Sequence, residues 1–135
     1  MSDPRDYNQT VIKTFRASGG AVGGAAPLLL LTTTGAKSGR PHTTPVAYST
    51  DGDHLVIIAS KGGAPTHPDW FHNLLANPIV AVELGTERFQ ARATVTEGQE
   101  RERLYAQHAA LMPGFAEYQQ KTARQIPVVL LDRLA

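Results

Sequence analysis

Cysteine is absent from the 135-residue sequence, which excludes a disulfide framework and a thiolate metal site. An excess of one charge is nearly absent too, because the formal net charge is only +1 at pH 7. Such a small excess gives no field that attracts nucleic acid, so we expect no nucleic-acid partner. The longest apolar run, residues 26–31, is far too short to span a bilayer. These absences predict a cytoplasmic protein whose length still allows a hydrophobic core.

Several catalytic motifs are missing as well. The segment GAKSG lacks the glycine spacing of a phosphate-binding P-loop and leads into a strand, which excludes ATP hydrolysis by that motif. No serine lies in the glycine-flanked pattern of an acyl-transfer nucleophile. The histidines form no i, i+4 pair that would bind a metal on one helix face, so we expect no metal site. They are His42, His54, His67, His72 and His108.

The amino-terminal part predicts an amphipathic helix followed by a glycine-rich connector. Tyr7, Val11 and Phe15 recur at helical spacing, and four glycines follow within residues 18–26. We therefore divide the chain into residues 1–26, the helix and connector, and residues 27–135, the main domain. The helix could cover a pocket, dock on the body or contact the inner face of a membrane. The first two roles are favoured, because a short helix of modest charge binds lipid weakly.

The main domain is expected to contain six strands and outer helices. Apolar or alternating patterns predict strands at residues 27–34, 44–50, 54–60, 78–84, 88–95 and 126–134. Asp-Gly and Gly-Thr turn signals near Gly52 and Gly85 predict two hairpins. Capping-box spacings predict helices that start at Thr66 and Thr96. Strands that are mostly joined by hairpins, with helices outside them, predict a small antiparallel barrel in a mainly β (α+β) fold.

Two glycine-rich loops carry polar residues at strand ends. The first, GAKSGRP, offers the cations Lys37 and Arg40 and the Ser38 hydroxyl, which suit an anion. The second, ASKGG at residues 59–63, would let the backbone approach a planar ring closely. Each cation alone is more often a solvated loop residue, and Trp70 alone is more often a core residue. Together the loops indicate a small barrel that binds an anionic ligand.

Four ordered motifs resemble a known family. They are LLLTTTGAKSGRPHTTPV, VIIASKGGAPTHPDWFHNLLANP, RFQARATV and PGFAEYQQKTARQIPVVLL, which together span about residues 28–131. This order resembles the deazaflavin-dependent nitroreductases, a branch of the split β-barrel flavin and deazaflavin oxidoreductases that uses coenzyme F420. The resemblance implies a six-stranded antiparallel split β-barrel of the FMN-binding type. It also implies an F420H2-dependent reductase that passes a hydride to a quinone, an activated alkene or a nitroaromatic.

The resemblance implies roles for particular residues. F420 has a polyanionic tail, whose phosphate the first loop would hold through Lys37 and Ser38. The second loop would lie against the ring, and the segment around Trp70 would close its far side. The full set expected at the cofactor is Ala36, Lys37, Ser38, Arg40, His42, Thr43, Thr44, Pro45, Val46, Ala47, Ile58, Ala59, Ser60, Lys61, Gly62, Asp69, Trp70, Phe71, His72 and Asn73.

The acceptor side is expected to be apolar. Met112, Phe115 and Tyr118 would line the substrate pocket, with Met112 and Phe115 standing where relatives that activate nitroimidazoles carry tyrosines. We therefore expect a small hydrophobic acceptor, with quinones or enones preferred over nitroimidazoles. Tyr118 is the first candidate for stabilising or protonating the reduced acceptor, and Ser60 is the second.

Two alternatives and the oligomeric state stay open at the level of sequence. FMN would also fit such a barrel, although the two cations of the first loop favour the longer anionic tail of F420. The protein could bind F420 or FMN without a dedicated turnover. Split barrels of this kind often form homodimers, but no residue in the sequence marks an interface.

Overall fold

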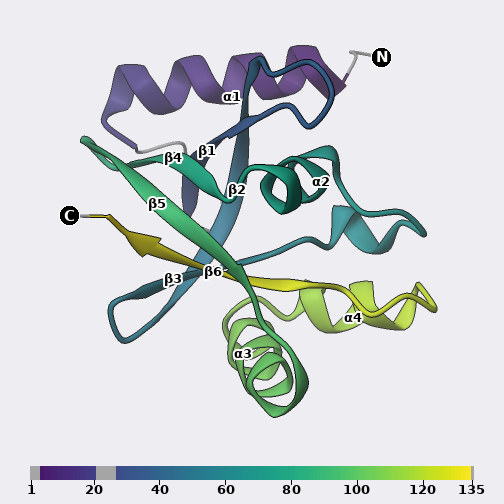
Figure 1. The fold of residues 1–135 in the computed structure, drawn as a ribbon. Helices are drawn as coiled ribbons and strands as arrows, with labels where there is room; N and C mark the ends of the chain where they lie inside the picture. Colours follow the sequence, from purple (N-terminus) through teal and green to yellow (C-terminus); the bar gives the residue numbers. More distant parts are fainter. Residues whose placement is uncertain (1–3, 21–26, 135) are drawn as a thin grey trace.

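A computed structural model describes residues 4–20 and 27–134, which form a closed six-stranded barrel with helices outside it (Figure 1). The strands are β1 (Leu28–Thr34), β2 (Pro41–Asp51), β3 (His54–Ile58), β4 (Ile79–Leu84), β5 (Glu87–Val95) and β6 (Val128–Arg133). The helices are α1 (Pro4–Ser18), α2 (Asp69–Ala76), α3 (Gly98–Leu111) and α4 (Gly114–Gln120), with a 3-10 turn, η1 (Lys61–Gly63). The predicted strands and the predicted antiparallel barrel are confirmed.

The barrel closes in the order β1-β2-β3-β6-β5-β4, with every neighbouring pair antiparallel. Leu31 lies opposite Val82 where β1 meets β4, so the described sheet has no open edge. The two hairpins form where turn residues predicted them. Gly52 and Gly85 both have a φ of +60°, a left-handed conformation that glycine adopts without steric cost.

Strand β1 is covered on both faces, as its continuous apolar run predicts. Leu29 and Leu31 point into the barrel, where they join the main core cluster. Leu30 points outward and packs against Ile12 and Phe15 of α1. Helix α1 therefore docks on the barrel, whereas residues 21–26 of the predicted connector lie outside the described part of the chain.

Two predicted helix starts are wrong. Helix α2 begins at Asp69 rather than Thr66, and the Thr66 hydroxyl accepts a hydrogen bond from the Lys61 ammonium at 3.3 Å. Helix α3 begins two residues after Thr96, whose hydroxyl donates to the Val128 carbonyl at 2.9 Å. In both cases the threonine hydroxyl bonds a partner outside the helix, so neither capping box forms.

The hydrophobic core has two main clusters. One fills the barrel interior and the other lies outside the barrel under α3. Trp70, Phe71 and Leu74 of α2 join the cluster that fills the barrel interior. A second cluster lies outside the barrel under α3, around Leu104 and Ile126. Helix α2 thus closes one end of the barrel, beside the loops that carry the predicted site.

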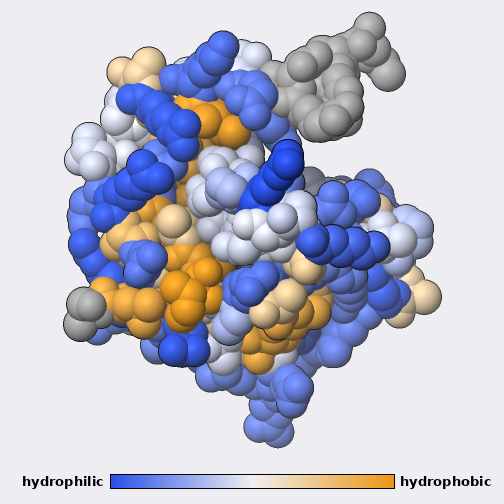
Figure 2. Space-filling view, turned by 45° about the horizontal axis from the view of Figure 1, so that its top comes forward, coloured by the Kyte–Doolittle hydropathy of each residue, from blue (hydrophilic) through white to orange (hydrophobic). Residues whose placement is uncertain are grey.

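The outer surface is mixed in character. Figure 2 shows apolar side chains on one face in separate areas that polar side chains surround. Large exposed apolar residues in the described part of the chain are Leu75, Leu111 and Leu134. Within that same part, no helix combines the length and the apolar character that a membrane crossing needs.

Candidate functional site

The loop between β1 and β2, residues 35–40, forms a tight elbow. The Gly35 N–H donates to the Arg40 carbonyl at 2.8 Å, and the Gly39 N–H donates to the Gly35 carbonyl at 3.0 Å. A Cβ at Gly35 would collide with the Ser38 hydroxyl and the His42 ring. This close packing favours glycine at position 35, because any side chain there would displace Ser38 and His42. It also places Ser38 and His42 side by side, with 3.4 Å between Oγ and Nε2.

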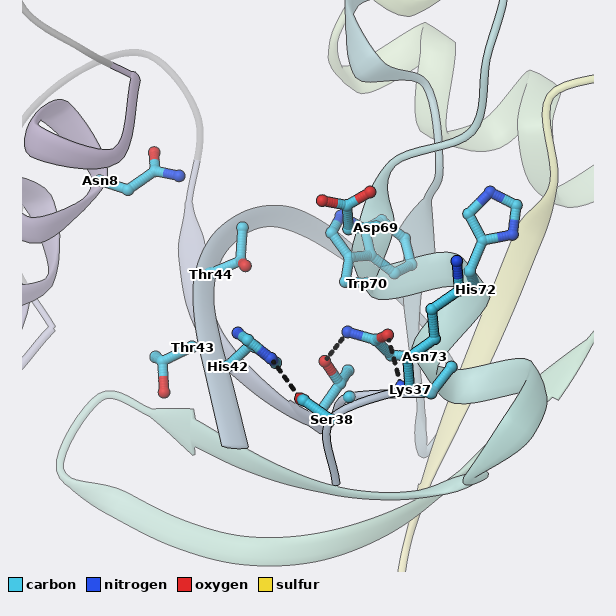
Figure 3. Close-up of a pocket in the computed structure, with 13 residues that line it drawn as sticks. Asn8, Lys37, Ser38, His42, Thr43, Thr44, Asp69, Trp70, His72 and Asn73 are labelled. Atoms are coloured by element: carbon cyan, nitrogen blue, oxygen red, sulfur yellow. Dashed lines mark hydrogen bonds between the residues drawn. The ribbon is translucent and has the colours of Figure 1, made fainter. Parts of the chain in front are cut away.

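Asn73 of α2 joins the elbow to the rest of the barrel, as Figure 3 shows. Its Oδ1 accepts a hydrogen bond from the Ala36 N–H at 3.0 Å, and its Nδ2 donates to the buried Thr33 hydroxyl at 3.2 Å. The N–H groups of Gly35, Ala36 and Gly39 therefore already have partners within the protein. An anion at this elbow would depend mainly on side-chain donors.

A pocket of about 780 Å³ opens beside the elbow. Figure 3 shows the elbow residues and Asn73 on one side of it and Asn8 of α1 on another, with Asp69 and Trp70 at the start of α2. The lining residues are Asn8, Thr33, Gly35, Ala36, Lys37, Ser38, His42, Thr43, Thr44, Asp69, Trp70, His72 and Asn73. The pocket thus gathers most of the tail-binding residues that the sequence predicts. Asn8, Thr33 and Gly35 are additions.

The pocket lining favours an anion, with one exception. Lys37 supplies a cation, and Thr43 and Thr44 supply hydroxyl groups. Asp69, in the first turn of α2, is the one carboxylate among the described residues of the lining. Lys37 is exposed, so salt will screen its attraction for a ligand.

A smaller hollow of about 230 Å³ lies beyond Trp70. Its lining residues are Pro45, Val46, Ala47, Ile58, Ser60, Lys61, Gly62, Pro68, Trp70, Phe115 and Tyr118. Trp70 lines both hollows, so one indole forms a wall that they share. Most residues that line the smaller hollow have apolar side chains, but Ser60 and Tyr118 bring hydroxyl groups to it and Lys61 brings a cation.

The two candidate catalytic residues therefore lie in one hollow. Ser60 is 8% exposed, and it lies in the loop that follows β3, one residue beyond Ala59. Tyr118 of α4 packs edge-on against Phe115, with 5.1 Å between ring centroids. The Lys121 ammonium lies 5.8 Å from the centroid of the Tyr118 ring.

Four residues expected at the site line neither hollow: Arg40, Ala59, Phe71 and Met112. Ala59 and Phe71 are buried in the barrel core, so their packing supports the loops from behind. Arg40 is exposed and contributes its backbone to the elbow. Met112 ends α3, next to the helix that carries Phe115.

Sequence reasoning missed two groups near the site, the partly buried Arg124 and the buried His108. Arg124 binds the loop that follows β3, and burial lowers the pKa of its guanidinium. His108 of α3 is fully buried, and burial lowers its pKa to about 4. Its Nδ1 lies 2.7 Å from the Ser49 hydroxyl, whereas its Nε2 has no partner among the described residues. Its ring packs edge-on against Phe115 at 4.5 Å, so it supports a wall of the smaller hollow.

A closed six-stranded antiparallel barrel with helices outside it and a Lys37-bearing pocket at its end fits the class of split-barrel flavin and deazaflavin oxidoreductases. Residues 7–133 match the profile of the family described as F420H(2)-dependent quinone reductase. Over 128 residues the chain is 41% identical to an F420H(2)-dependent quinone reductase of Mycobacterium tuberculosis, an alignment that covers 88% of this chain and 85% of the relative. The chain belongs to the F420H(2)-dependent quinone reductase family.

Solved structures agree with this assignment. An F420-H2 dependent reductase, FDR-A, is 41% identical, with a TM-score of 0.72 over 78% of this chain and 94% of that one. A structure described as a domain-swapped dimer is 35% identical, with a TM-score of 0.75 over 96% of this chain and all of that one. The split-barrel fold, the oxidoreductase class and the cofactor F420 are thereby confirmed.

Proposed function

We propose that this chain reduces a hydrophobic quinone with F420H2, using the two adjoining hollows for cofactor and acceptor. The observation that carries the proposal is that Trp70 lines both hollows, because it joins the pocket of about 780 Å³ that contains Lys37 to the hollow of about 230 Å³ that contains Ser60 and Tyr118. When bound, the reduced deazaflavin supplies a hydride, two electrons with one hydrogen nucleus, and one further proton completes the hydroquinone.

The larger pocket suits the polyanionic tail. Lys37 offers a charged donor, and the neighbouring Ser38 and His42 side chains offer polar contacts to phosphate or carboxylate oxygens. Asn8 and the threonines of β2 extend this polar lining along the pocket. Asp69 opposes a long anionic tail, so its carboxylate is expected to limit the affinity rather than to abolish binding.

The ring belongs at the junction of the two hollows. Trp70 presents an aromatic wall there, and Gly62, at φ +64°, leaves room for a planar ring to approach the backbone. These groups would orient the ring and exclude water from one of its faces. The reacting carbons must come within about 3–3.5 Å of each other for transfer.

The smaller hollow suits an apolar acceptor. Val46, Phe115 and the Tyr118 ring provide contact area, while the hydroxyl groups of Ser60 and Tyr118 can donate to a carbonyl oxygen. Tyr118 is the proposed proton donor to the reduced quinone, and Ser60 is the second candidate. Because apolar residues make up most of the lining beside the donors Ser60, Lys61 and Tyr118, a quinone is expected to be reduced faster than a nitroimidazole.

Two further proposals concern partners of the chain. The relative described as a domain-swapped dimer supports a homodimer, which light scattering of the purified protein would test. Packing of Ile12 and Phe15 on Leu30 engages the apolar side of α1. This packing favours docking of α1 on the barrel over contact with a membrane surface.

The proposed function is tested by the rate of cofactor oxidation. F420H2 is mixed with a soluble quinone, with and without the protein, and its absorbance is followed. We expect oxidation to be much faster with the protein than without it. If bound F420H2 reacts no faster than free F420H2, the chain binds the cofactor without this turnover.

A further inference from the structure

The loop of residues 59–67, which joins β3 to α2, has an unusual backbone. Three successive residues are left-handed, with φ of +47° at Lys61, +64° at Gly62 and +83° at Gly63. Lys61 is the one non-glycine residue at positive φ in the described part of the chain. That conformation costs about 1–2 kcal/mol, so it persists only where the surroundings hold the loop.

Arg124, from the segment that follows α4, holds this loop along its whole length. Its Nε donates to the Ala64 carbonyl at 2.9 Å, and its Nη2 donates to the Ser60 carbonyl at 2.8 Å. Its Nη1 donates to the Ala59 carbonyl at 3.2 Å and to His67 Nδ1 at 2.8 Å. These acceptors extend from the first residue of the loop to the last.

The same arginine is tied to the opposite wall of the smaller hollow. The Gln119 side chain, at the end of α4, donates to the Arg124 carbonyl at 2.8 Å. The loop also abuts α4 directly, because a Cβ at Gly63 would lie 2.8 Å from the Tyr118 carbonyl. Arg124 therefore holds the loop that carries Ser60 close to the helix that carries Tyr118.

The pattern of acceptors is specific to a guanidinium. Three backbone carbonyls and one imidazole nitrogen surround Arg124, and among the described residues no carboxylate pairs with it. A planar fork with five N–H groups can serve these four acceptors at once, whereas the compact ammonium of lysine cannot. Since His67 Nδ1 must accept, the His67 ring is neutral in this arrangement. Burial and the neighbouring Arg124 lower its pKa accordingly.

We propose that Arg124 is a positioning residue for hydride transfer, which acts by fixing the two walls of the acceptor hollow relative to each other. Arg124 lines neither hollow, so it acts through the 59–67 loop and α4 rather than on the reactants. The inference rests on the proposed function, because its kinetic consequence requires that the quinone bind in that hollow. A displacement of about 1 Å between reacting groups can cost about a hundredfold in rate.

Three variants separate positioning from general stabilisation. Arg124→Ala removes the clamp, and Arg124→Lys keeps a cation without the fork. Arg101→Lys is the control, because Arg101 is an arginine that donates to Gln119 and to the Ile126 carbonyl in the same segment and is even more buried than the half-buried Arg124. None of its hydrogen bonds within the described residues reaches the 59–67 loop.

The kinetic test compares kcat with cofactor affinity. Both Arg124 variants are expected to lose ten- to a hundredfold in kcat for quinone reduction, while the Kd for F420 changes less than threefold. Millimolar guanidinium is expected to restore part of the kcat of Arg124→Ala, and Arg101→Lys is expected to keep kcat within threefold. The proposal is overturned if Arg124→Lys keeps kcat within twofold of wild type, or if Arg101→Lys loses as much. If Arg124→Ala does not fold, the kcat of Arg124→Lys is compared with those of Arg101→Lys and wild type.

Amide hydrogen exchange tests the clamp without any cofactor. Arg124→Ala or Arg124→Lys is expected to speed exchange of the amides in the 59–67 loop and to leave those of the barrel strands unchanged. Unchanged exchange in the loop overturns the clamp even if wild-type protein reduces quinone. Faster exchange together with no quinone reduction by wild-type protein overturns the proposed function and leaves the clamp standing.

Discussion

Lys37 and Asp69 place opposite charges on the wall of one pocket. Lys37 extends from the elbow between β1 and β2, and Asp69 lies in the first turn of α2. A tail that carries several negative charges is attracted by the first side chain and repelled by the second. The affinity of the pocket for an anion therefore depends on both, and each can be changed separately.

Replacing Asp69 by Asn is expected to tighten F420 binding. The substitution removes the carboxylate from the pocket and should lower the Kd about three- to tenfold at low salt, with a smaller effect at high salt. Titration of both proteins with F420 at two salt concentrations measures the change. Asp53→Asn, in the hairpin between β2 and β3, is the control and should leave the Kd unchanged. Weaker binding by Asp69→Asn would mean that the carboxylate contacts the cofactor favourably.

Replacing Tyr118 by Phe is expected to slow the reduction of quinone. The variant keeps the ring that packs against Phe115 and loses the hydroxyl that would donate to the acceptor. We expect a ten- to hundredfold lower kcat, with little change in F420 affinity. Tyr48→Phe is the matched control, since Tyr48 packs on the barrel core and lines neither hollow. If Tyr118→Phe keeps its kcat within twofold of wild type, Tyr118 is not the proton donor and Ser60 becomes the candidate.

At the scale of elements, α1 links the start of the chain to the pocket. Phe15 is 1% exposed where it packs on Leu30, and Arg16 pairs with Glu83 of β4 at 2.9 Å. These contacts hold the helix in the position from which Asn8 reaches the pocket lining. The helix is therefore part of the site and not a separate appendage.

Phe15→Ala is expected to destabilise the protein and to weaken F420 binding. Removing a buried phenylalanine ring typically costs about 3–5 kcal/mol, and undocking of α1 would withdraw Asn8 from the pocket. Denaturant unfolding and an F420 titration measure the two effects. Arg16→Gln is the milder comparison, because Arg16 is exposed and loss of its pair with Glu83 is expected to cost at most about 1 kcal/mol and to leave α1 docked. Unchanged F420 affinity in Phe15→Ala would show that α1 does not shape the pocket.

Elements with strong local signals were predictable from the sequence. The leucine run of β1 and the glycine turns gave the strands because hydrophobic periodicity and positive φ are local properties. The start of α3 was not predictable, because the Thr96 hydroxyl bonds Val128, which is close only in the folded chain. The start of α2 was not predictable either, because the Thr66 hydroxyl accepts from Lys61 within the preceding loop instead of capping the helix. The spacing of a capping box does not reveal that another partner will bond the threonine hydroxyl.

The residues of the candidate pocket were predictable where loops carry their own motif. The elbow with Lys37 and Ser38 could be recognised from its glycines and charges, and the structure places both residues at the pocket. Asn8 and Arg124 could not be found this way. Each reaches the site only through packing with segments more than 20 residues away along the chain. No local pattern marks them.

For the whole molecule, buried His108 links stability to pH. Its pKa is about 4 in the folded protein, against 6.5 when exposed, because burial disfavours the charged ring. As the pH falls below about 6.5, the unfolded state takes up this proton first, and acid therefore favours unfolding. His67, whose pKa is also lowered, acts in the same direction. His54 acts in the opposite direction, since hydrogen bonding to Asp132 raises its pKa and its contribution is lost as the pH rises.

The free energy of unfolding is expected to fall between about pH 6.5 and pH 4 by about 3 kcal/mol from His108 alone. Urea unfolding at a series of pH values measures this slope. His108→Gln should flatten the acid side of the profile, whatever it does to stability at pH 7. If the free energy of unfolding falls equally with pH in the variant and in the wild type, groups other than His108 cause the loss of stability in acid.

The most direct test of the account is a titration of the protein with F420 and, in parallel, with FMN. Trp70, the one tryptophan of the sequence, lines both hollows and reports binding through its fluorescence. We predict low-micromolar or tighter binding of F420, weaker binding of FMN, and loss of F420 affinity in Lys37→Ala and at high salt. Tighter binding of FMN than of F420, or an F420 affinity unaffected by Lys37→Ala, would contradict the proposal that this pocket holds a polyanionic tail.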